Sequence, residues 1–462
     1  MVATFDVEPE TAVVYGEGWQ SWSVVEPVPI RSEPFRPSDP NSLVIDCQPG
    51  IADLPGAHGG SGLLVVQSGS EAHVFGVDDA SREVVPIWAT EHGGTVVVRA
   101  AGEVTHVVDR GGGGVEGALA RWGDRFASGL GIGPVATIPP VWCSWYQYFD
   151  EVREHDVVEN LEAMDDLEVA VGVVQIDDGY QAAAGDWLES SGRFPDLPGL
   201  VGRVRSSGRR AGIWIAPFVV GLSSRLAAEH PDWVVSDPAH GRPVPVGAVL
   251  RDQCAALDVT HPGARGYLER VLATMGSWGI DYVKIDFAYA GAVDGLRHEA
   301  VTGVEAYRYG LRVVKDALGP DATLLGCGAP VLPSVGLVDA LRVGPDIALH
   351  VEPATGNPSM PSQRAAARNT AARAWQHGRL YVNDPDCLVA RPEMEQREQW
   401  AETVERVGGL RASSDRLRSL DAWGLEATRR LLVPSSAEPF VPSDSSEAHV
   451  ATTGPTGKDG TP

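Results

Sequence analysis

One predicted strand places a carboxylate beside an ammonium group. In the segment YVKIDFAY, Lys284 and Asp286 are two residues apart. Side chains at positions i and i+2 of a strand lie on the same face, so both point into the same space. A neighbouring ammonium group keeps a buried carboxylate ionised, and an ionised carboxylate can act as a nucleophile. Asp286 is therefore our candidate nucleophile.

A second carboxylate meets the needs of a general acid. Asp346 follows Arg342 by four residues and lies on a predicted loop, so the strand does not lock it in place. A general acid must hold a proton near neutral pH and reach the leaving oxygen. A gap of about 5 to 5.5 Å between the two carboxylates would give double displacement with retention, whereas about 6.5 to 9.5 Å would admit a water molecule and give inversion. The sequence leaves this gap undetermined.

The elements that must position these two residues are parallel β/α units. From residue 141 on, short apolar runs alternate with longer amphipathic stretches, a pattern typical of parallel strands joined by helices. The predicted strands are residues 141–146, 171–177, 211–218, 281–287, 323–328, 340–345, 380–384 and 407–413. Eight such units imply an α/β fold of the closed (β/α)8 TIM-barrel type, whose active site forms at the carboxyl ends of the strands. The connection at residues 330–339 is too short for a full barrel helix.

The predicted strand ends are rich in polar residues. They are Asp177, Asp178, Gly179, Lys284, Asp286, Cys327, Arg342, Asp346, Asn383, Asp384, Asp386, Ser413, Ser414 and Asp415. Asp and Asn also commonly begin the loop after a strand and cap the following helix. For Asp384, Asp386 and Asp415, this structural role is as well supported as direct substrate contact.

Aromatic side chains also gather near the strand ends. Recognition of a sugar needs polar groups for the hydroxyls and aromatic faces for the apolar side of the ring. Most of these aromatic residues must belong to the core, and we expect Trp145, Tyr180 and Trp214 to contact a ligand.

The remaining chain divides by composition. Residues 1–112 consist of short β-branched runs separated by Gly, Asp, Ser and Pro, which predicts an N-terminal antiparallel β-sandwich domain. Residues 113–140 form a helical linker, and residues 141–432 form the barrel. Residues 433–462 are rich in Ser, Pro, Thr, Gly and Asp, which predicts a disordered tail.

The net charge limits the classes of partner. The chain has 62 Asp and Glu residues against 37 Lys and Arg residues, a net charge of −25. A field of that sign repels nucleic acid and anionic membranes, so we expect neither as a partner and favour a neutral substrate. The N-terminal segment has neither a basic start nor an apolar run, and we therefore expect a cytoplasmic protein.

We expect no cofactor and no metal. The five cysteines are widely spaced without a C-x-x-C pair, which argues against a disulfide framework and a structural zinc site. The acidic motifs DDG and NDPD lie on separate predicted strands beside Lys284 and Arg342. A site for a divalent cation would not normally contain two fixed positive charges.

Seven motifs resemble one known family in their order along the chain. They are WCSWYQYFDEV, VVQIDDGYQAAAGDW, GIWIAPF, LDVTHP, DYVKIDF, LRVGPD and LYVNDPD. Over residues 137–420 the chain resembles the microbial α-galactosidases of glycoside hydrolase family thirty-six, also called melibiases. The segment GWQSWS at residues 18–23 resembles the β-domain of that family. The resemblance implies a retaining enzyme that hydrolyses terminal α-galactosides of oligosaccharides through a covalent glycosyl-enzyme intermediate.

The resemblance also implies the catalytic roles. Asp286 matches the family's nucleophile, and Asp346, four residues after Arg342, matches its acid/base. Asp177 and Asp178 match the paired aspartates that hold the galactose 4- and 6-hydroxyls.

Further contacts follow from the same resemblance. Lys284 would bind the 3- and 4-hydroxyls, while Cys327 and Gly328, with Arg342, would face the 2-position. Trp19 and Trp22 would reach over the barrel from the β-domain and help to shape the pocket.

The chain departs from the family in its flanks and at one strand. Many relatives have a longer N-terminal sandwich and a C-terminal β-domain that supply assembly contacts, so the sequence leaves a homo-oligomer open. Ala216 and Pro217 stand where several relatives have an acidic residue, so subsite preference is also open.

Two other activities fit the same fold. A sugar hydroxyl instead of water could resolve the covalent intermediate, as in a galactosyl transferase of the raffinose-synthase kind. The residues around Cys327 and Gly328 would decide between an α-galactosidase and an α-N-acetylgalactosaminidase. A catalytically inactive sugar-binding protein is disfavoured because both candidate carboxylates are present.

Overall fold

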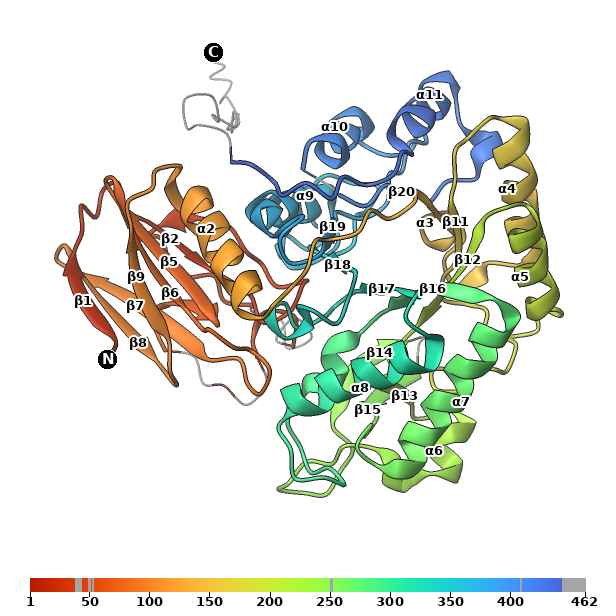
Figure 1. Cartoon of the computed structure of the whole chain (residues 1–462), viewed down its shortest axis with the longest axis horizontal. Coiled ribbons are helices and arrows are strands. Elements are labelled where there is room, and N and C mark those ends of the chain that lie inside the picture. The colour runs from red at the N-terminus through yellow and green to blue at the C-terminus, as the bar shows by residue number, and fades with distance from the viewer. Residues whose placement is uncertain (38–43, 49–50, 52–53, 250–251, 408, 443–462) are drawn as a thin grey trace, which may run out of the picture.

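Eight parallel strands form one sheet in the larger part of the molecule (Figure 1). The computed structural model describes residues 1–37, 44–48, 51, 54–249, 252–407 and 409–442. The strands are β10 (Val141–Cys143), β11 (Val173–Ile176), β12 (Arg210–Ile215), β16 (Ile280–Ile285), β17 (Thr323–Gly326), β18 (Ala340–Arg342), β19 (Val382–Asp384) and β20 (Ala412–Ser413). Each coincides with one of the predicted strands.

The sheet closes on itself. Its order is β19-β18-β17-β16-β12-β11-β10-β20. Leu388, just beyond β19, forms a parallel bridge with Ser413 of β20. The expected barrel is therefore confirmed, and the carboxyl ends of all its strands meet at one face.

Helices cover the outside of the barrel (Figure 1). They are α4 (Glu154–Asp166), α5 (Leu197–Ser206), α7 (Pro262–Trp278), α8 (Gly303–Leu318), α9 (Gln363–Ala372), α10 (Arg397–Val407) and α11 (Ala422–Leu431). In α8 the residues Val304, Tyr307 and Leu311 recur at helical spacing and are buried. A capping box between Thr302 and Glu305 begins this helix, because each side chain satisfies a backbone N–H that the helix leaves free.

Shorter helical pieces complete the connections. They are α3 (Trp145–Tyr148), α6 (Arg225–Glu229), and the 3-10 turns η1 (Phe149–Glu151), η2 (Pro231–Trp233), η3 (Ala288–Ala292), η4 (Leu332–Ser334), η5 (Ala374–Gln376) and η6 (Leu417–Ser419). The turn η4 is the helical element between β17 and β18, as the short connection at residues 330–339 predicted. Within the described residues, no helix is both long and apolar enough to span a membrane.

A small antiparallel sheet, which the sequence did not predict, follows β12. It consists of β13 (Val219–Gly221), β15 (Asp252–Ala256) and β14 (Pro245–Val249). The hydroxyl of Tyr289 donates a 2.7 Å hydrogen bond to the carbonyl of Val246 in β14. This bond ties the sheet to the turn that follows Asp286.

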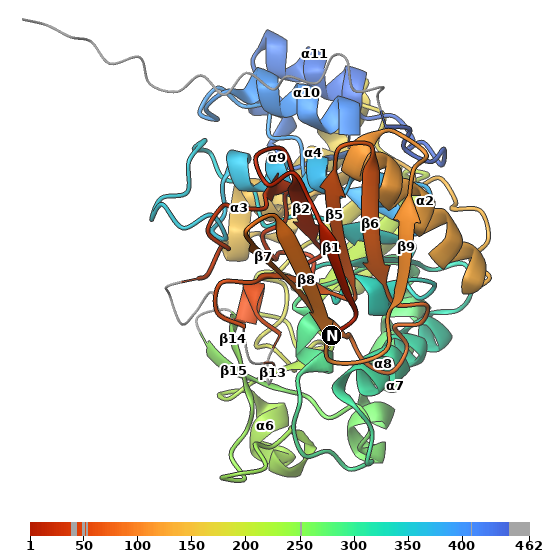
Figure 2. The ribbon, with the colours of Figure 1, turned by 90° about the vertical axis from the view of Figure 1, so that its left-hand side faces the viewer.

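The N-terminal part contains two antiparallel sheets, which face the viewer in Figure 2. One has the order β3 (Val28–Pro29), β2 (Val13–Gly16), β5 (Leu63–Ser68), β6 (Glu71–Gly76) and β9 (Thr105–Asp109). The other has the order β1 (Ala3–Asp6), β8 (Thr95–Ala100), β7 (Pro86–His92) and β4 (His58–Ser61). Side chains from both sheets, among them Phe75 and Ile87, share one buried cluster. Helix α2 (Gly114–Gly129) packs against the five-stranded sheet.

A segment between β2 and β3 joins these sheets to the barrel. Gln20 forms an antiparallel bridge with Pro330, and the N–H of Ser21 donates to the carbonyl of Ala329 at 2.9 Å. Pro330 lies in the connection after β17. The segment therefore lies over the carboxyl ends of the strands, where an active site would form.

The end of the described chain contacts the barrel. We expected residues 433–462 to be disordered, yet Ser435 is buried and exchanges hydrogen bonds with the backbone of Ile138. The N–H of Phe440 donates to the carbonyl of His377 at 3.1 Å. Residues 433–442 are thus held against the barrel because their backbone groups find partners there. The rest of the expected tail, residues 443–462, lies outside the described residues.

Candidate active site

Asp286 lies directly after β16, with an exposed fraction of 8%. The indole N–H of Trp214 donates to its Oδ2 at 2.9 Å, and the backbone N–H of Phe287 donates to its Oδ1 at 2.8 Å. Burial raises the pKa of this carboxyl, but the charge of Lys284 and hydrogen bonds from Trp214, Cys327 and Phe287 bring the pKa below its usual range. Asp286 is therefore held ionised, as a nucleophile must be.

The residue after Asp286 has an unusual backbone conformation. Phe287 has a φ of 47°, in the left-handed region that non-glycine residues rarely adopt. Such conformations persist where the surrounding structure determines them, and they cluster at functional sites. Here the conformation accompanies the hydrogen bond that Phe287 donates to Asp286.

Lys284 links Asp286 to a second buried carboxylate. Its ammonium nitrogen lies 3.7 Å from Oδ2 of Asp286 and 3.1 Å from Oδ2 of Asp177. Burial lowers the pKa of Lys284, but the two carboxylates bring it well above the usual value. Gln175 also donates to Oδ2 of Asp177, at 2.6 Å. The predicted pairing of Lys284 with Asp286 is present, and it extends to the end of β11.

Asp178 adds a third carboxylate to this cluster. Its Oδ1 accepts a 2.6 Å hydrogen bond from the side chain of Gln181. Burial raises the pKa of Asp178 to about 7, with the charges of Asp177 and Asp286 adding to the rise and the bond from Gln181 opposing it. Asp178 is therefore a carboxyl that changes charge near neutral pH.

Arg342 holds three carboxylates after β18. Its NH1 lies 2.9 Å from Oδ1 of Asp346, its NH2 2.9 Å from Oδ1 of Asp386, and its Nε 3.3 Å from Oδ2 of Asp384. Arg342 itself is buried, and the side chain of Asp346 is 36% exposed while the other two carboxylates are at most 4% exposed. Asp346 is therefore the carboxylate of this group that a ligand can reach.

The structure separates the two roles that the sequence left open for the remaining aspartates. Asp384 and Asp386 hold Arg342, and Asp415 forms a 2.8 Å ion pair with Arg391. All three carboxylates are buried. Their contacts are structural, because each is occupied by an arginine or by backbone N–H groups.

Cys327 and Gly328 follow β17 beside Asp286. The thiol of Cys327 is fully buried and hydrogen-bonds to Asp286. Gly328 has a φ of 55°, and a Cβ at this position would lie 2.9 Å from the ring of Trp22. A glycine is therefore required here by both backbone and space.

The tryptophans of the N-terminal segment lie beside this turn. The ring of Trp22 contacts Phe287 edge-on, with centroids 5.4 Å apart, and Trp19 contacts Tyr289 in the same way at 5.9 Å. Neither indole N–H has a hydrogen-bond partner among the described residues. The structure thus brings Trp19 and Trp22 to the site from another part of the chain.

The three aromatic residues predicted to contact a ligand differ in exposure. Tyr180 is 1% exposed and Trp214 is 2% exposed, so protein covers their ring faces. Their ring faces are therefore not open for stacking in this structure, and Trp214 acts on the site through the N–H that it donates to Asp286. Trp145 is half-buried and contacts Phe149 edge-on at 5.3 Å.

Two residues that hold the site, Gln175 and Tyr146, were not predicted from the sequence. Gln175 stands two residues before Asp177, so the strand period that paired Lys284 with Asp286 could have found it. Tyr146, whose hydroxyl donates to Asp386, gave no such signal. Its partner is 240 residues away in sequence.

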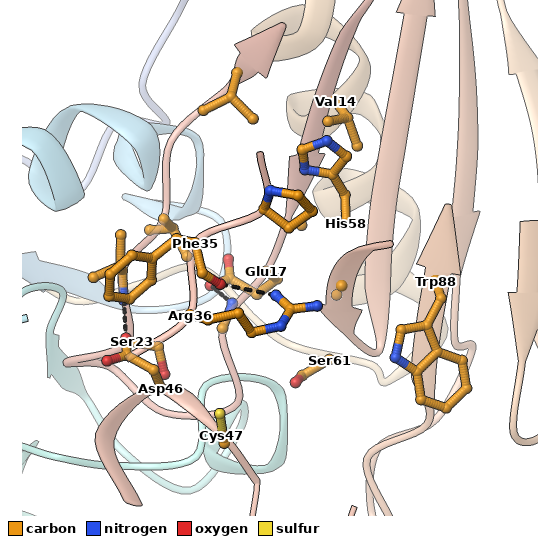
Figure 3. A pocket seen from close by; sticks show the side chains of 18 of the residues that line it. Val14, Glu17, Ser23, Phe35, Arg36, Asp46, Cys47, His58, Ser61 and Trp88 are labelled. Carbon is orange, nitrogen blue, oxygen red and sulfur yellow. Dashed lines mark hydrogen bonds between the residues drawn. The ribbon is translucent and has the colours of Figure 1, made fainter. Parts of the chain in front are cut away.

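A separate cavity of about 330 Å³ lies in the N-terminal part (Figure 3). Its lining includes Arg36, Asp46, His58 and Trp88 but none of the candidate catalytic carboxylates. Asp46 is already occupied by the N–H of Val24 at 2.8 Å and by a serine hydroxyl. We therefore place the chemistry at the barrel and not in this cavity.

Comparisons with known proteins agree with this geometry. The Melibiase family model matches residues 139–315. The structure of TtGalA, an α-galactosidase from Thermus thermophilus in complex with stachyose, superposes with a TM-score of 0.78 and 29% identity, over 91% of this chain and 90% of that chain. Over residues 139–315 the chain is thus similar to the melibiase family.

Two curated relatives match the chain over shorter regions and are much longer proteins. The α-galactosidase of Escherichia coli is 34% identical over 128 residues, which are 25% of this chain and 17% of that protein. The probable α-galactosidase C of Aspergillus flavus is 28% identical over 215 residues, 41% of this chain and 27% of that protein. The matched regions thus span less than a third of these two curated relatives.

Proposed function

We propose that this chain is a retaining α-galactosidase that hydrolyses terminal α-galactosides of oligosaccharides. The observation that carries the proposal is the buried carboxylate of Asp286, held ionised by Lys284 and Trp214. A fixed, ionised carboxylate at the carboxyl end of a barrel strand is what attack on a sugar carbon requires. The likeness to an α-galactosidase with bound stachyose supports the choice of sugar.

In the first step, a carboxylate oxygen of Asp286 attacks the anomeric carbon. The bond from that carbon to the leaving oxygen breaks, and Asp346 gives its proton to the leaving oxygen. In the second step, Asp346 takes a proton from water, the water oxygen attacks the anomeric carbon, and the ester bond to Asp286 breaks. The exposure of Asp346 supports this role because the proton must pass to a leaving group and then come from water.

The remaining polar groups would bind the sugar. Asp177 and Asp178 would accept hydrogen bonds from the 4- and 6-hydroxyls, and Lys284 would contact the 3- and 4-hydroxyls. Cys327 and Gly328, together with Arg342, would face the 2-position. The short contacts from Lys284 to both Asp177 and Asp286 support one common binding space.

We further propose that the N-terminal sheets form a β-sandwich domain over residues 1–112 that completes the pocket. The unpartnered indole N–H groups of Trp19 and Trp22 support this role, because buried donors normally have acceptors. Residues 113–140 would be the linker and residues 141–432 the catalytic barrel. A cytoplasmic location is supported by the buried thiols of Cys143 and Cys327 near the site.

Hydrolysis of a panel of nitrophenyl glycosides tests the proposal. The panel contains the α-galactoside, α-glucoside, α-N-acetylgalactosaminide and β-galactoside, and we expect preference for the α-galactoside. NMR of the first-formed sugar should show the α-anomer, the sign of retention. Asp286→Gly should abolish turnover, and azide should restore it by taking the place of the lost nucleophile.

Other outcomes would contradict the proposal. Preference for the α-N-acetylgalactosaminide would reassign the sugar, and a β-anomer as first product would contradict retention. Inactivity of the wild-type protein on the whole panel would contradict the proposed hydrolysis.

A further inference from the structure

Asp386 is a fully buried carboxylate to which the proposed reaction assigns no part. It lies two residues after β19 and has a φ of 99°. An L-residue rarely adopts this backbone conformation, which persists only where the surrounding structure determines it. A role in capping the loop does not by itself explain this backbone conformation of Asp386.

Both oxygens of Asp386 have two partners each. Oδ1 accepts the N–H of Cys387 at 2.7 Å and lies 2.9 Å from NH2 of Arg342. Oδ2 accepts the N–H of Ile347 at 2.9 Å and the hydroxyl of Tyr146. Such a carboxylate cannot rotate without breaking several hydrogen bonds in a dry environment, where each is costly to lose.

Two of these partners are the immediate neighbours of Asp346. Arg342, which Asp386 holds through NH2, contacts Oδ1 of Asp346 through NH1 at 2.9 Å. Ile347, whose N–H Asp386 accepts, is the next residue in the chain after Asp346. Asp386 thus restrains Asp346 in two ways. It holds Arg342, which contacts the Asp346 side chain, and it accepts the backbone N–H of Ile347, the next residue in the chain.

We propose that Asp386 is a positioning residue that sets the place of the acid/base Asp346. The inference rests on the proposed function, since it needs Asp346 to transfer the proton. Asp384 differs, because it contacts Arg342 at 3.3 Å and accepts the N–H of Asp386, with no bond to the backbone beside Asp346.

The test is Asp386→Asn, assayed with two substrates. Asparagine keeps the shape but replaces one acceptor oxygen by an NH₂ group, so it cannot accept from all four partners. A nitrophenyl α-galactoside has a good leaving group, whereas an α-galactosyl-glucose disaccharide needs protonation of its leaving oxygen. We expect kcat/KM to fall about 100-fold for the disaccharide and less than about 10-fold for the nitrophenyl substrate.

Asp415→Asn is the matched control. Asp415 is equally buried and paired with an arginine, but that arginine is Arg391. The control should change kcat/KM equally for both substrates. Equal losses for both substrates in Asp386→Asn, or the same leaving-group dependence in Asp415→Asn, would overturn the inference.

Two further measurements keep the inference separate from folding and from the proposed function. If Asp386→Asn does not fold, Tyr146→Phe decides, because it removes one donor to Asp386 and should show a smaller loss with the same substrate dependence. Equal losses for both substrates in Tyr146→Phe would overturn the inference.

Asp346→Ala separates the inference from the proposed function, and it must show the strongest leaving-group dependence of all the variants. If Asp346→Ala shows this dependence and Asp386→Asn does not, the inference fails and the proposed function stands. A wild-type protein inactive on both substrates would overturn the proposed function, and the inference with it.

Discussion

The carboxylate of Glu17 and the guanidinium of Arg373 lie 2.8 Å apart, and both side chains are fully excluded from solvent. Arg373 also donates to the carbonyl of Ser21 and, at 2.8 Å, to that of Val343. Val343 is the residue after Arg342. One buried ion pair therefore joins the segment that carries Trp19 and Trp22 to the strand that carries Arg342.

Removing one partner of this pair should destabilise the protein strongly. Glu17→Ala leaves the Arg373 guanidinium buried without its carboxylate, and we expect the free energy of unfolding to fall by about 3 to 5 kcal/mol. Asp124→Ala is the matched control, because Asp124 pairs with Arg379 at the same 2.8 Å but is 58% exposed. That change should cost less than about 1 kcal/mol. Urea denaturation measures both, and equal losses would contradict the expectation.

A side chain at position 328 should disturb both the turn and Trp22. Gly328→Ala combines a φ of 55° with a Cβ 2.9 Å from the Trp22 ring, so we expect kcat/KM to fall at least about 10-fold and stability to fall by more than about 1 kcal/mol. Gly356→Ala separates the two causes, since Gly356 has a φ of 71° but no atom within 4 Å of the new Cβ. The control should lose stability and keep its kcat/KM. Unchanged activity of Gly328→Ala would show that Trp22 and this turn do not contribute to catalysis or substrate binding.

Asp178 should make stability depend on pH with an unusual sign. Its pKa is raised to about 7 in the folded protein, so the folded state binds the proton more tightly than the unfolded chain, whose pKa is about 4. The contribution of protonated Asp178 to the free energy of unfolding is then fully present below about pH 4, and it is lost as the pH rises through about 7. Asp178→Asn should therefore be more stable than the wild type at pH 8, by up to about 4 kcal/mol, and no more stable at pH 4. Chemical denaturation at the two pH values measures this difference. A variant more stable than the wild type only at pH 4 would contradict the expectation.

The thiol of Cys327 should tune the ionisation of Asp286. Its hydrogen bond helps to hold the pKa of Asp286 below the usual range, so Cys327→Ala should raise that pKa and move the acidic limb of the kcat/KM profile to higher pH. Cys327→Ser keeps a donor and should move the limb less. Cys254→Ala changes a buried thiol that donates instead to the carbonyl of Asp252 at 3.4 Å, and it should leave the limb in place. If the acidic limb of the kcat/KM profile does not move in Cys327→Ala, then Lys284 and Trp214 suffice to keep the pKa of Asp286 low.

The sequence by itself determined the barrel and most of its acidic cluster. Strand and helix periods depend on local spacing, so the eight strands could be located from apolar runs. The pairing of Lys284 with Asp286 followed from the two-residue period of a strand. The short connection after β17 was also visible, because residues 330–339 are too few for a barrel helix.

Only the tertiary structure decided what lies around that cluster. Asp384, Asp386 and Asp415 look alike in sequence, and their arginine partners distinguish them because ion pairing depends on distance in space. Tyr180 and Trp214 end up with covered rings, since packing by distant segments sets their exposure. Glu17 and Arg373 are 356 residues apart, and no local pattern links them. Burial and long-range contacts are properties of the assembled chain, and they decide which carboxylate is free to react.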